Sequence, residues 1–195
     1  MQFEVLEKRI YDWLEQELAS TLHYHGLHHT QDVLSAATRI GIAVGVKEHE
    51  LQLVQLAALF HDTGFVNQYK ENEPVGADFA RKILPEYGYE ASDIEHVAAM
   101  ILATRIPQAP QDHLAQILCD ADLDYLGRDD FFIVAHSLRL EWDKYGIKFA
   151  LTEWYNLQIQ FLSKHKYFTS ISQKLREGKK QEHLAEIQEL MSVRA

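Results

Sequence analysis

The chain has 195 residues, of which 47% are hydrophobic and 25% charged, and a chain of this size can bury a core without disulfides. Its 19 Lys and Arg against 29 Asp and Glu give a net charge of −10 at pH 7, which excludes a general binder of nucleic-acid polymers or anionic membranes. Cys119 is the single cysteine, so an intrachain disulfide and a thiolate-rich metal cage are excluded. Without a recognisable leader or a long apolar run, the sequence predicts a cytoplasmic protein.

Apolar residues recur at helical spacing along the chain, and no segment alternates as a half-buried strand does. The predicted helices cover about residues 2–20, 29–44, 48–62, 74–84, 93–104, 112–124, 129–144, 147–164 and 168–193. We expect Pro74 to open the fourth helix, and Ser92 and Asp93 to cap the fifth. The pattern predicts an all-α fold, a bundle of about eight to nine helices in a single globular domain over residues 1–195.

A histidine and an aspartate, His61 and Asp62, follow the apolar third helix directly, and Gly64 ends that helix. An imidazole and a carboxylate are costly in a core unless they are paired, hydrogen-bonded or bound to a metal. Adjacent helical side chains point about 100° apart, so these two converge on one ion most easily where the chain turns. A metal site is the first hypothesis, and a helix-terminal ion pair is the alternative.

Histidines also cluster upstream of this pair, where four of the chain's 11 histidines occupy residues 23–29. Imidazole is the commonest side-chain metal ligand, so this segment is a plausible second half of the site. His25 is a candidate contact to a metal ligand or to substrate. Surface or loop positions are the alternative for His23, His25 and His28.

Three carboxylates alternate in the apolar helix predicted over residues 112–124. Asp120 and Asp124 share a face at 3.6 residues per turn, whereas Asp122 points to nearly the opposite side. The three side chains therefore cannot all bind one ion. We expect Asp120 to hydrogen-bond within the site or to cap a neighbouring helix, and Asp124 to be structural.

Together, these residues resemble the HD superfamily of metal-dependent phosphohydrolases. The resemblance lies in three motifs: Tyr24-His25-x-x-x-His29-Thr30, the apolar run ending in His61-Asp62-Thr63-Gly64, and Asp120-Ala121-Asp122 followed by Leu126-Gly127. It covers about residues 21–130 and implies that these form the metal-site core, with C-terminal helices over 131–195 packed on it. It implies one divalent ion held by His29, His61, Asp62 and Asp122, with manganese, iron, cobalt, nickel, zinc and magnesium all open.

The resemblance also implies the reaction. A divalent ion in such a site lowers the pKa of bound water towards about 7 and neutralises phosphoryl oxygens, which favours hydrolysis of a phosphoester or phosphoanhydride. We expect Asp62 and Glu73 to serve catalysis, with Asp120 and Asp124 as alternatives to Glu73. Arg105 and Lys70 are candidates for binding the phosphate of the substrate, and solvated surface cations are the alternative for both.

Two departures from the family pattern narrow the expectation. The segments that carry additional histidines in members with two metals read Asn72-Glu73-Pro74 and Ala103-Thr104-Arg105 here, which disfavours a dinuclear site and the oxygenase chemistry of certain relatives. Members that act as nucleotidases carry a glutamate three residues past the HD aspartate, and this chain has Phe65 there. The role of that glutamate falls to another carboxylate or is vacant.

The leading prediction is a hydrolase of a small phosphorylated molecule, above all a nucleotide. The alternative is a metal-binding, ligand-sensing or regulatory module with little turnover, which the missing glutamate at position 65 favours. The aromatic-rich stretch from Trp142 to Phe168 is core packing by default, and a base-stacking wall or a homodimer face is the alternative. The expected partners are thus the small substrate and, as an open alternative, a second copy of the chain.

Overall fold

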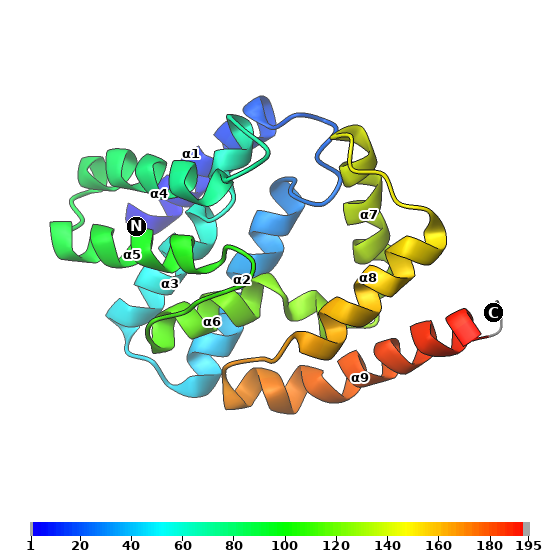
Figure 1. The fold of residues 1–195 in the computed structure, drawn as a ribbon. Helices are drawn as coiled ribbons and strands as arrows, with labels where there is room; N and C mark the ends of the chain where they lie inside the picture. The colour runs from blue at the N-terminus through cyan, green and yellow to red at the C-terminus, as the bar shows by residue number, and fades with distance from the viewer. Residues whose placement is uncertain (1, 193–195) are drawn as a thin grey trace.

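The computed structural model describes residues 2–192, which form nine α-helices and three short 3₁₀ helices and contain no β-strand (Figure 1). The all-α prediction is confirmed for these residues. Residues 1 and 193–195 lie outside the described residues, and with them the last residue of the helix predicted over 168–193. The α-helices are α1 (Gln2–Glu17), α2 (Leu27–Val44), α3 (Glu48–Phe60), α4 (Asn72–Ile83), α5 (Ala91–Ala103), α6 (His113–Asp122), α7 (Phe131–Lys144), α8 (Leu151–Lys164) and α9 (Ser170–Ser192).

The predicted starts of α2, α4, α5, α7 and α9 differ from the observed ones by two residues each, and that of α8 differs by four. Helix α4 begins at Asn72, and Pro74 is its third residue, because no residue of the first turn needs its N–H for an intrahelical bond. Helix α5 begins at Ala91 after Glu90, so Ser92 and Asp93 lie inside its first turn and do not cap it. Asp112 does cap α6, because its carboxylate accepts a hydrogen bond from the amide of Ala115 at 2.8 Å.

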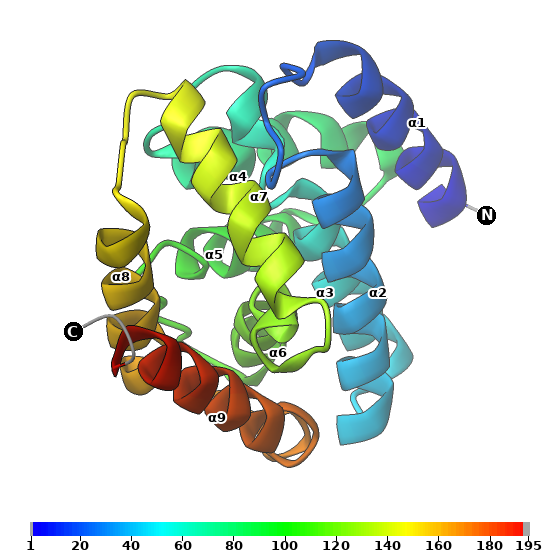
Figure 2. The ribbon, with the colours of Figure 1, turned by 90° about the vertical axis from the view of Figure 1, so that its right-hand side faces the viewer.

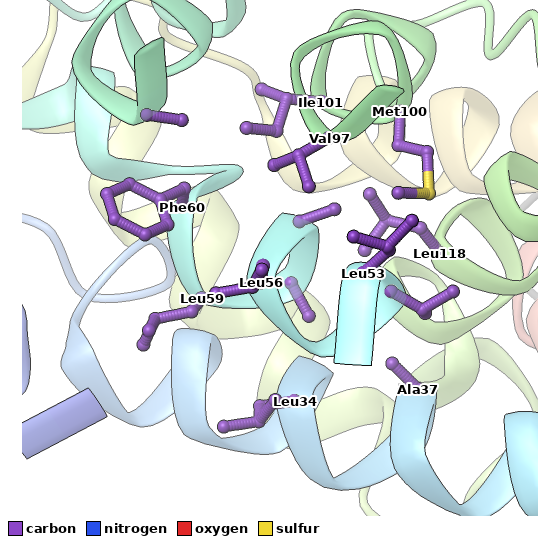
Figure 3. Packing of buried hydrophobic residues seen from close by; sticks show 14 of the residues in the cluster. Leu34, Ala37, Leu53, Leu56, Leu59, Phe60, Val97, Met100, Ile101 and Leu118 are labelled. Carbon is purple, nitrogen blue, oxygen red and sulfur yellow. The ribbon is translucent and has the colours of Figure 1, made fainter. Parts of the chain in front are cut away.

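Helix α3 is the centre of the first and larger apolar core. Its side chains Leu56, Leu59 and Phe60 are fully buried, and the helix contacts α2, α4, α5 and α6. Figure 3 shows these residues packed against Val97 and Ile101 of α5. Because the second half of α3 is buried, His61 and Asp62 at its end are buried as well, and their polar atoms need partners inside the protein.

A second apolar cluster joins α7, α8 and α9 to the 3₁₀ helix η3 (Asp124–Gly127). Figures 1 and 2 show these three helices on one side of the molecule, with α2 and α6 between them and α1, α3, α4 and α5. Leu123 and Leu126 bring the end of α6 into this second cluster. The end of α6 therefore lies where the two clusters meet.

Two of the alternating carboxylates hold α9 in place. Asp120 accepts hydrogen bonds from the amides of Phe168 and Thr169 and from the Thr169 hydroxyl, at 2.7 to 2.8 Å. Asp124 binds the guanidinium of Arg176 through both carboxylate oxygens, at 2.8 and 2.9 Å. Both carboxylates are thus engaged in structural contacts, and neither remains as an alternative to Glu73.

The turn after α3 brings α4 back against the end of α3. It forms the 3₁₀ helix η1 (Thr63–Val66), in which a Cβ on Gly64 would lie 2.0 Å from the carbonyl oxygen of Asn72. Only glycine allows this approach, and the approach sets Asn72 and Glu73 beside the His61-Asp62 pair.

Among residues 2–192, no helix is both long and apolar enough to cross a bilayer.

Candidate metal centre

Four side chains converge at the junction of the two clusters: His29 from α2, Asp122 from α6, and His61 and Asp62 from the turn after α3. The Nε2 atom of His29 lies 3.2 Å from Asp122 Oδ1, 3.4 Å from Asp62 Oδ2 and 3.4 Å from His61 Nε2. The Nε2 atom of His61 lies 3.2 Å from Asp62 Oδ2 and 3.7 Å from Asp122 Oδ1. The structure therefore brings together all four residues that the sequence singled out as metal ligands.

The spacing of these atoms fits a divalent ion. Donors about 2.1 Å from one ion are separated by roughly 3.0 Å in octahedral and 3.4 Å in tetrahedral geometry, which matches the separations around His29 and His61. Asp62 Oδ2 is buried and makes no hydrogen bond with any residue from 2 to 192. The Nε2 atoms of His61 and His29 lie 3.2 and 3.4 Å from this oxygen. A buried carboxylate oxygen without a hydrogen bond is costly, and a cation between these three atoms would supply a favourable interaction.

The atoms of these side chains that face away from the cluster have partners of their own. His61 donates Nδ1–H to the carbonyl of Ala58 at 2.8 Å, which leaves the Nε2 lone pair for an ion. Asn72 donates to Asp62 Oδ1 at 3.3 Å, and Gln108 donates to Asp122 Oδ2 at 3.2 Å. Such contacts fix the orientation of His61, Asp62 and Asp122 before an ion binds.

The electrostatics of the cluster show strong mutual pairing of its charges. Burial by itself would raise the pKa of the Asp62 carboxyl, but His61 and the other imidazoles nearby hold that pKa well below its ordinary value. Burial disfavours the His61 imidazolium, yet Asp62 and Asp122 raise the pKa of His61 to about 9. Without an ion, the pair at neutral pH is therefore an Asp62 carboxylate and a His61 imidazolium, and an ion that binds Nε2 of His61 must displace its proton.

A cavity of about 340 Å³ opens beside the cluster. Asp62, Asp122 and Glu73 line one side of it, and Glu73 Oε2 is buried without a hydrogen-bond partner among the described residues. The rest of the lining is mainly apolar and includes Trp142 of α7 and Phe161 of α8. This combination of an acidic end and an apolar wall is typical of a site for a small molecule that has a polar head.

A histidine and a buried glutamate form a second polar arrangement on the cavity wall. Glu141 of α7 is fully buried and accepts hydrogen bonds from the amides of Tyr24 and His25, from the Tyr69 hydroxyl and from Nδ1 of His25. The ring of His25 stacks on Phe65 with centroids 4.0 Å apart and lines the cavity. Glu141 thus orients His25 and leaves its Nε2 atom without a hydrogen bond to the part of the chain that the structure describes.

Sequence reasoning missed Glu141 and Gln158. Gln158 of α8 lines the cavity and is only 6% exposed, yet its side chain makes no hydrogen bond with residues 2–192. Lys70 and Arg105, which the sequence suggested as phosphate contacts, do not line the cavity. Arg105 is exposed and pairs with Glu71 at 3.3 Å. Their role in phosphate binding therefore stays a prediction.

The chain belongs to the HD domain family, whose model matches residues 26–124. A solved structure of a predicted HD superfamily hydrolase from an uncultured Thermotogales bacterium is similar in fold, with a TM-score of 0.65 and 18% sequence identity. The similarity covers 96% of this chain and 92% of that one. No curated protein matches. The family is one of metal-dependent hydrolases. The match spans His29, His61, Asp62 and Asp122, and the first, second and fourth of these offer ligand atoms that all lie within 4.8 Å of one another.

Proposed function

We propose that the protein is a metal-dependent phosphohydrolase that acts on a nucleotide, with one divalent ion held by His29, His61, Asp62 and Asp122. The observation that carries this proposal is the convergence of these donors around a buried Asp62 oxygen that has no hydrogen-bond partner. Two imidazoles and two carboxylates suit several divalent metals, and the donor set does not choose between them.

Glu73 is the residue proposed to accept the proton of the attacking water. When bound, the ion supplies an activated water and neutralises charge on the phosphoryl oxygens. The buried, unpartnered Oε2 of Glu73 lines the same cavity as Asp62 and Asp122, so it is within the site where that water would lie. Asp62, already ionised, completes the negative end of the cavity that holds the ion.

His25 is proposed to donate a proton to the leaving group. Its Nδ1 atom is bonded to Glu141, which fixes the ring, and its Nε2 atom is the one left to exchange a proton with a ligand. His25 is one of the neighbouring groups that lower the pKa of the Asp62 carboxyl. His25, Asp62 and Asp122 line the same cavity, so the proposed acid and the candidate ligands face one bound molecule.

The nucleotide component of the proposal is supported by the apolar wall. Trp142 and Phe161 offer aromatic surfaces for a flat ring, and the Gln158 amide offers one donor group and one acceptor to the edge of a base. Because the Gln158 amide makes no hydrogen bond within residues 2–192, both of its polar atoms are available to a ligand.

The test is hydrolysis by purified protein supplied with manganese or cobalt on a panel of nucleotides. We expect phosphate release from at least one nucleotide, no release by Asp62→Ala, and normal release by the control Asp129→Ala, whose side chain is 96% exposed. Failure of the whole panel, with metal binding demonstrated by calorimetry, would refute the proposal.

A ligand-sensing module with little turnover is the second candidate, because Phe65 occupies the position of the assisting glutamate and packs its ring on His25. Tight nucleotide binding without hydrolysis over hours would select this function.

A further inference from the structure

A second hollow of about 370 Å³ adjoins the cavity beside the metal centre. The two share a set of wall residues from the loop after α5, from the end of α6 and from α8, namely Ile106, Leu123, Leu157 and Phe161. They are therefore two halves of one cleft, with apolar side chains at the boundary between them. A ligand that fills both halves passes over this apolar strip.

The charges of the two halves are opposite. The first half is lined by Asp62, Glu73 and Asp122 and by no lysine or arginine. The second half is lined by Lys164 and Lys166 and by no aspartate or glutamate. Among residues 2–192, neither lysine forms an ion pair, although carboxylates outnumber basic residues by 29 to 19 in the chain. In the part of the chain that the structure describes, the ammonium groups that line the cleft thus belong to the half without carboxylates.

The segment that carries the two lysines is held by a fully buried ammonium. Lys180 of α9 donates to the backbone carbonyl of His165 at 2.7 Å and pairs with Glu177 at 2.9 Å. Its Nζ atom also lies 3.4 Å from Nδ1 of His165. Burial and the adjacent Lys180 charge lower the pKa of His165 to about 4, so its ring is neutral at pH 7. The segment from Lys164 to Lys166 is therefore held to α9 through the backbone carbonyl and the imidazole of His165.

From this arrangement we infer that Lys164 and Lys166 bind a second anionic group of the substrate, separated from the scissile phosphate by the organic part of the molecule. This inference rests on the proposed function and narrows its substrate to a nucleotide that carries phosphate at two separate positions. One phosphate is held at the metal centre, the apolar strip with Leu157 and Phe161 contacts the middle of the molecule, and the distal phosphate faces the two lysines.

The test compares ligands that differ in the second phosphate. Manganese-loaded protein is titrated by calorimetry with a nucleoside 5′-monophosphate, the matching 5′-diphosphate and the matching 3′,5′-bisphosphate. We expect the bisphosphate to bind about tenfold more tightly than the monophosphate, as two partly exposed charge pairs of about 0.7 kcal/mol each would give. The diphosphate, whose second phosphate adjoins the first, is expected to gain nothing from the lysines.

Variants assign the gain to the two residues. The double variant Lys164→Gln/Lys166→Gln is expected to lose the tenfold preference and to bind the monophosphate as before. The matched control Lys144→Gln/Lys174→Gln removes two exposed lysines that do not line the cleft and is expected to keep the preference. Equal affinity for all three ligands, or a preference that persists without Lys164 and Lys166, would overturn the inference.

Hydrolysis measured on the same samples separates the two proposals. Metal-dependent turnover of the monophosphate without a lysine-dependent gain refutes this inference and leaves the proposed function standing. A lysine-dependent gain in binding without turnover of any ligand supports the second subsite and refutes the hydrolase.

Discussion

Replacement of Glu141 by glutamine tests how strongly one buried carboxylate holds the cavity wall. Its Oε2 atom accepts from the amides of Tyr24 and His25 at 2.8 and 3.0 Å, and its Oε1 atom accepts from Nδ1 of His25 and from the Tyr69 hydroxyl. Glutamine retains one acceptor oxygen, which can serve the two amides. Its NH₂ group then faces the imidazole and the phenol and cannot accept from either.

The expected loss follows from these two contacts. Hydrogen bonds to a charged group contribute about 1.5 to 3 kcal/mol each, so losing two removes roughly 3 to 6 kcal/mol. A change of the His25 tautomer and rotation of the Tyr69 hydroxyl recover part of this loss, and we expect Glu141→Gln to lower the free energy of unfolding by about 2 to 4 kcal/mol. In a chain of this length that corresponds to a fall in Tm of about 4 to 16 °C.

The assay is urea denaturation of wild type, Glu141→Gln and the control Glu186→Gln, whose side chain is exposed on α9. Burial alone would raise the pKa of the Glu141 carboxyl, but His25 and the two amides hold it below its ordinary value of 4.5. The stability that ionised Glu141 provides is therefore complete above pH 4.5 and is lost as the pH falls through the lowered value. A loss below about 1 kcal/mol at pH 7, or a loss that grows on acidification, would refute the reasoning.

Gly64→Ala places a Cβ 2.0 Å from Asn72 O, so we expect an unfolding loss of at least about 1 to 3 kcal/mol and weaker manganese binding by calorimetry; unchanged metal affinity would contradict this. Gly127→Ala places a Cβ 2.3 Å from the carbonyl oxygen of Arg176, so hydrogen exchange in α9 is expected to rise while metal binding stays normal. Cys119 is fully buried, and burial raises the pKa of its thiol, so a thiol reagent at pH 8 should react only at the rate of unfolding; rapid reaction of the native protein argues against the buried position.

The helices were predictable because the apolar residues of each one define a face or, in α3, nearly the whole surface. The prediction for α3, residues 48–62, differs from the observed Glu48–Phe60 only at the turn that holds His61 and Asp62. Errors arose where several residues compete to begin a helix, as Pro74 and Ser92 did. A local preference cannot decide between neighbouring starts when the position of α4 is set by its contact with Gly64.

The candidate metal ligands were predictable because each stands in a short motif of unusual composition. Glu141 stands in an ordinary amphipathic helix, 116 residues from His25, and nothing in its surroundings distinguishes it from Asp143. A pairing over such a distance depends on how α7 packs against the start of α2. Arg105 is close to the site along the chain, yet its side chain does not line the cavity, and its role in phosphate binding stays a prediction.

The two apolar clusters contribute different parts of the site, the candidate metal ligands on one side and part of the cavity wall on the other. All four candidate ligands, and the candidate base Glu73, lie in the segment that matches the HD domain, residues 26–124. The wall that faces them, including Gln158 and Lys164, comes from α8, which lies beyond that segment. Substitutions in α8 can therefore alter which molecule fits while the chemistry stays the same, so relatives with the same metal residues need not share a substrate.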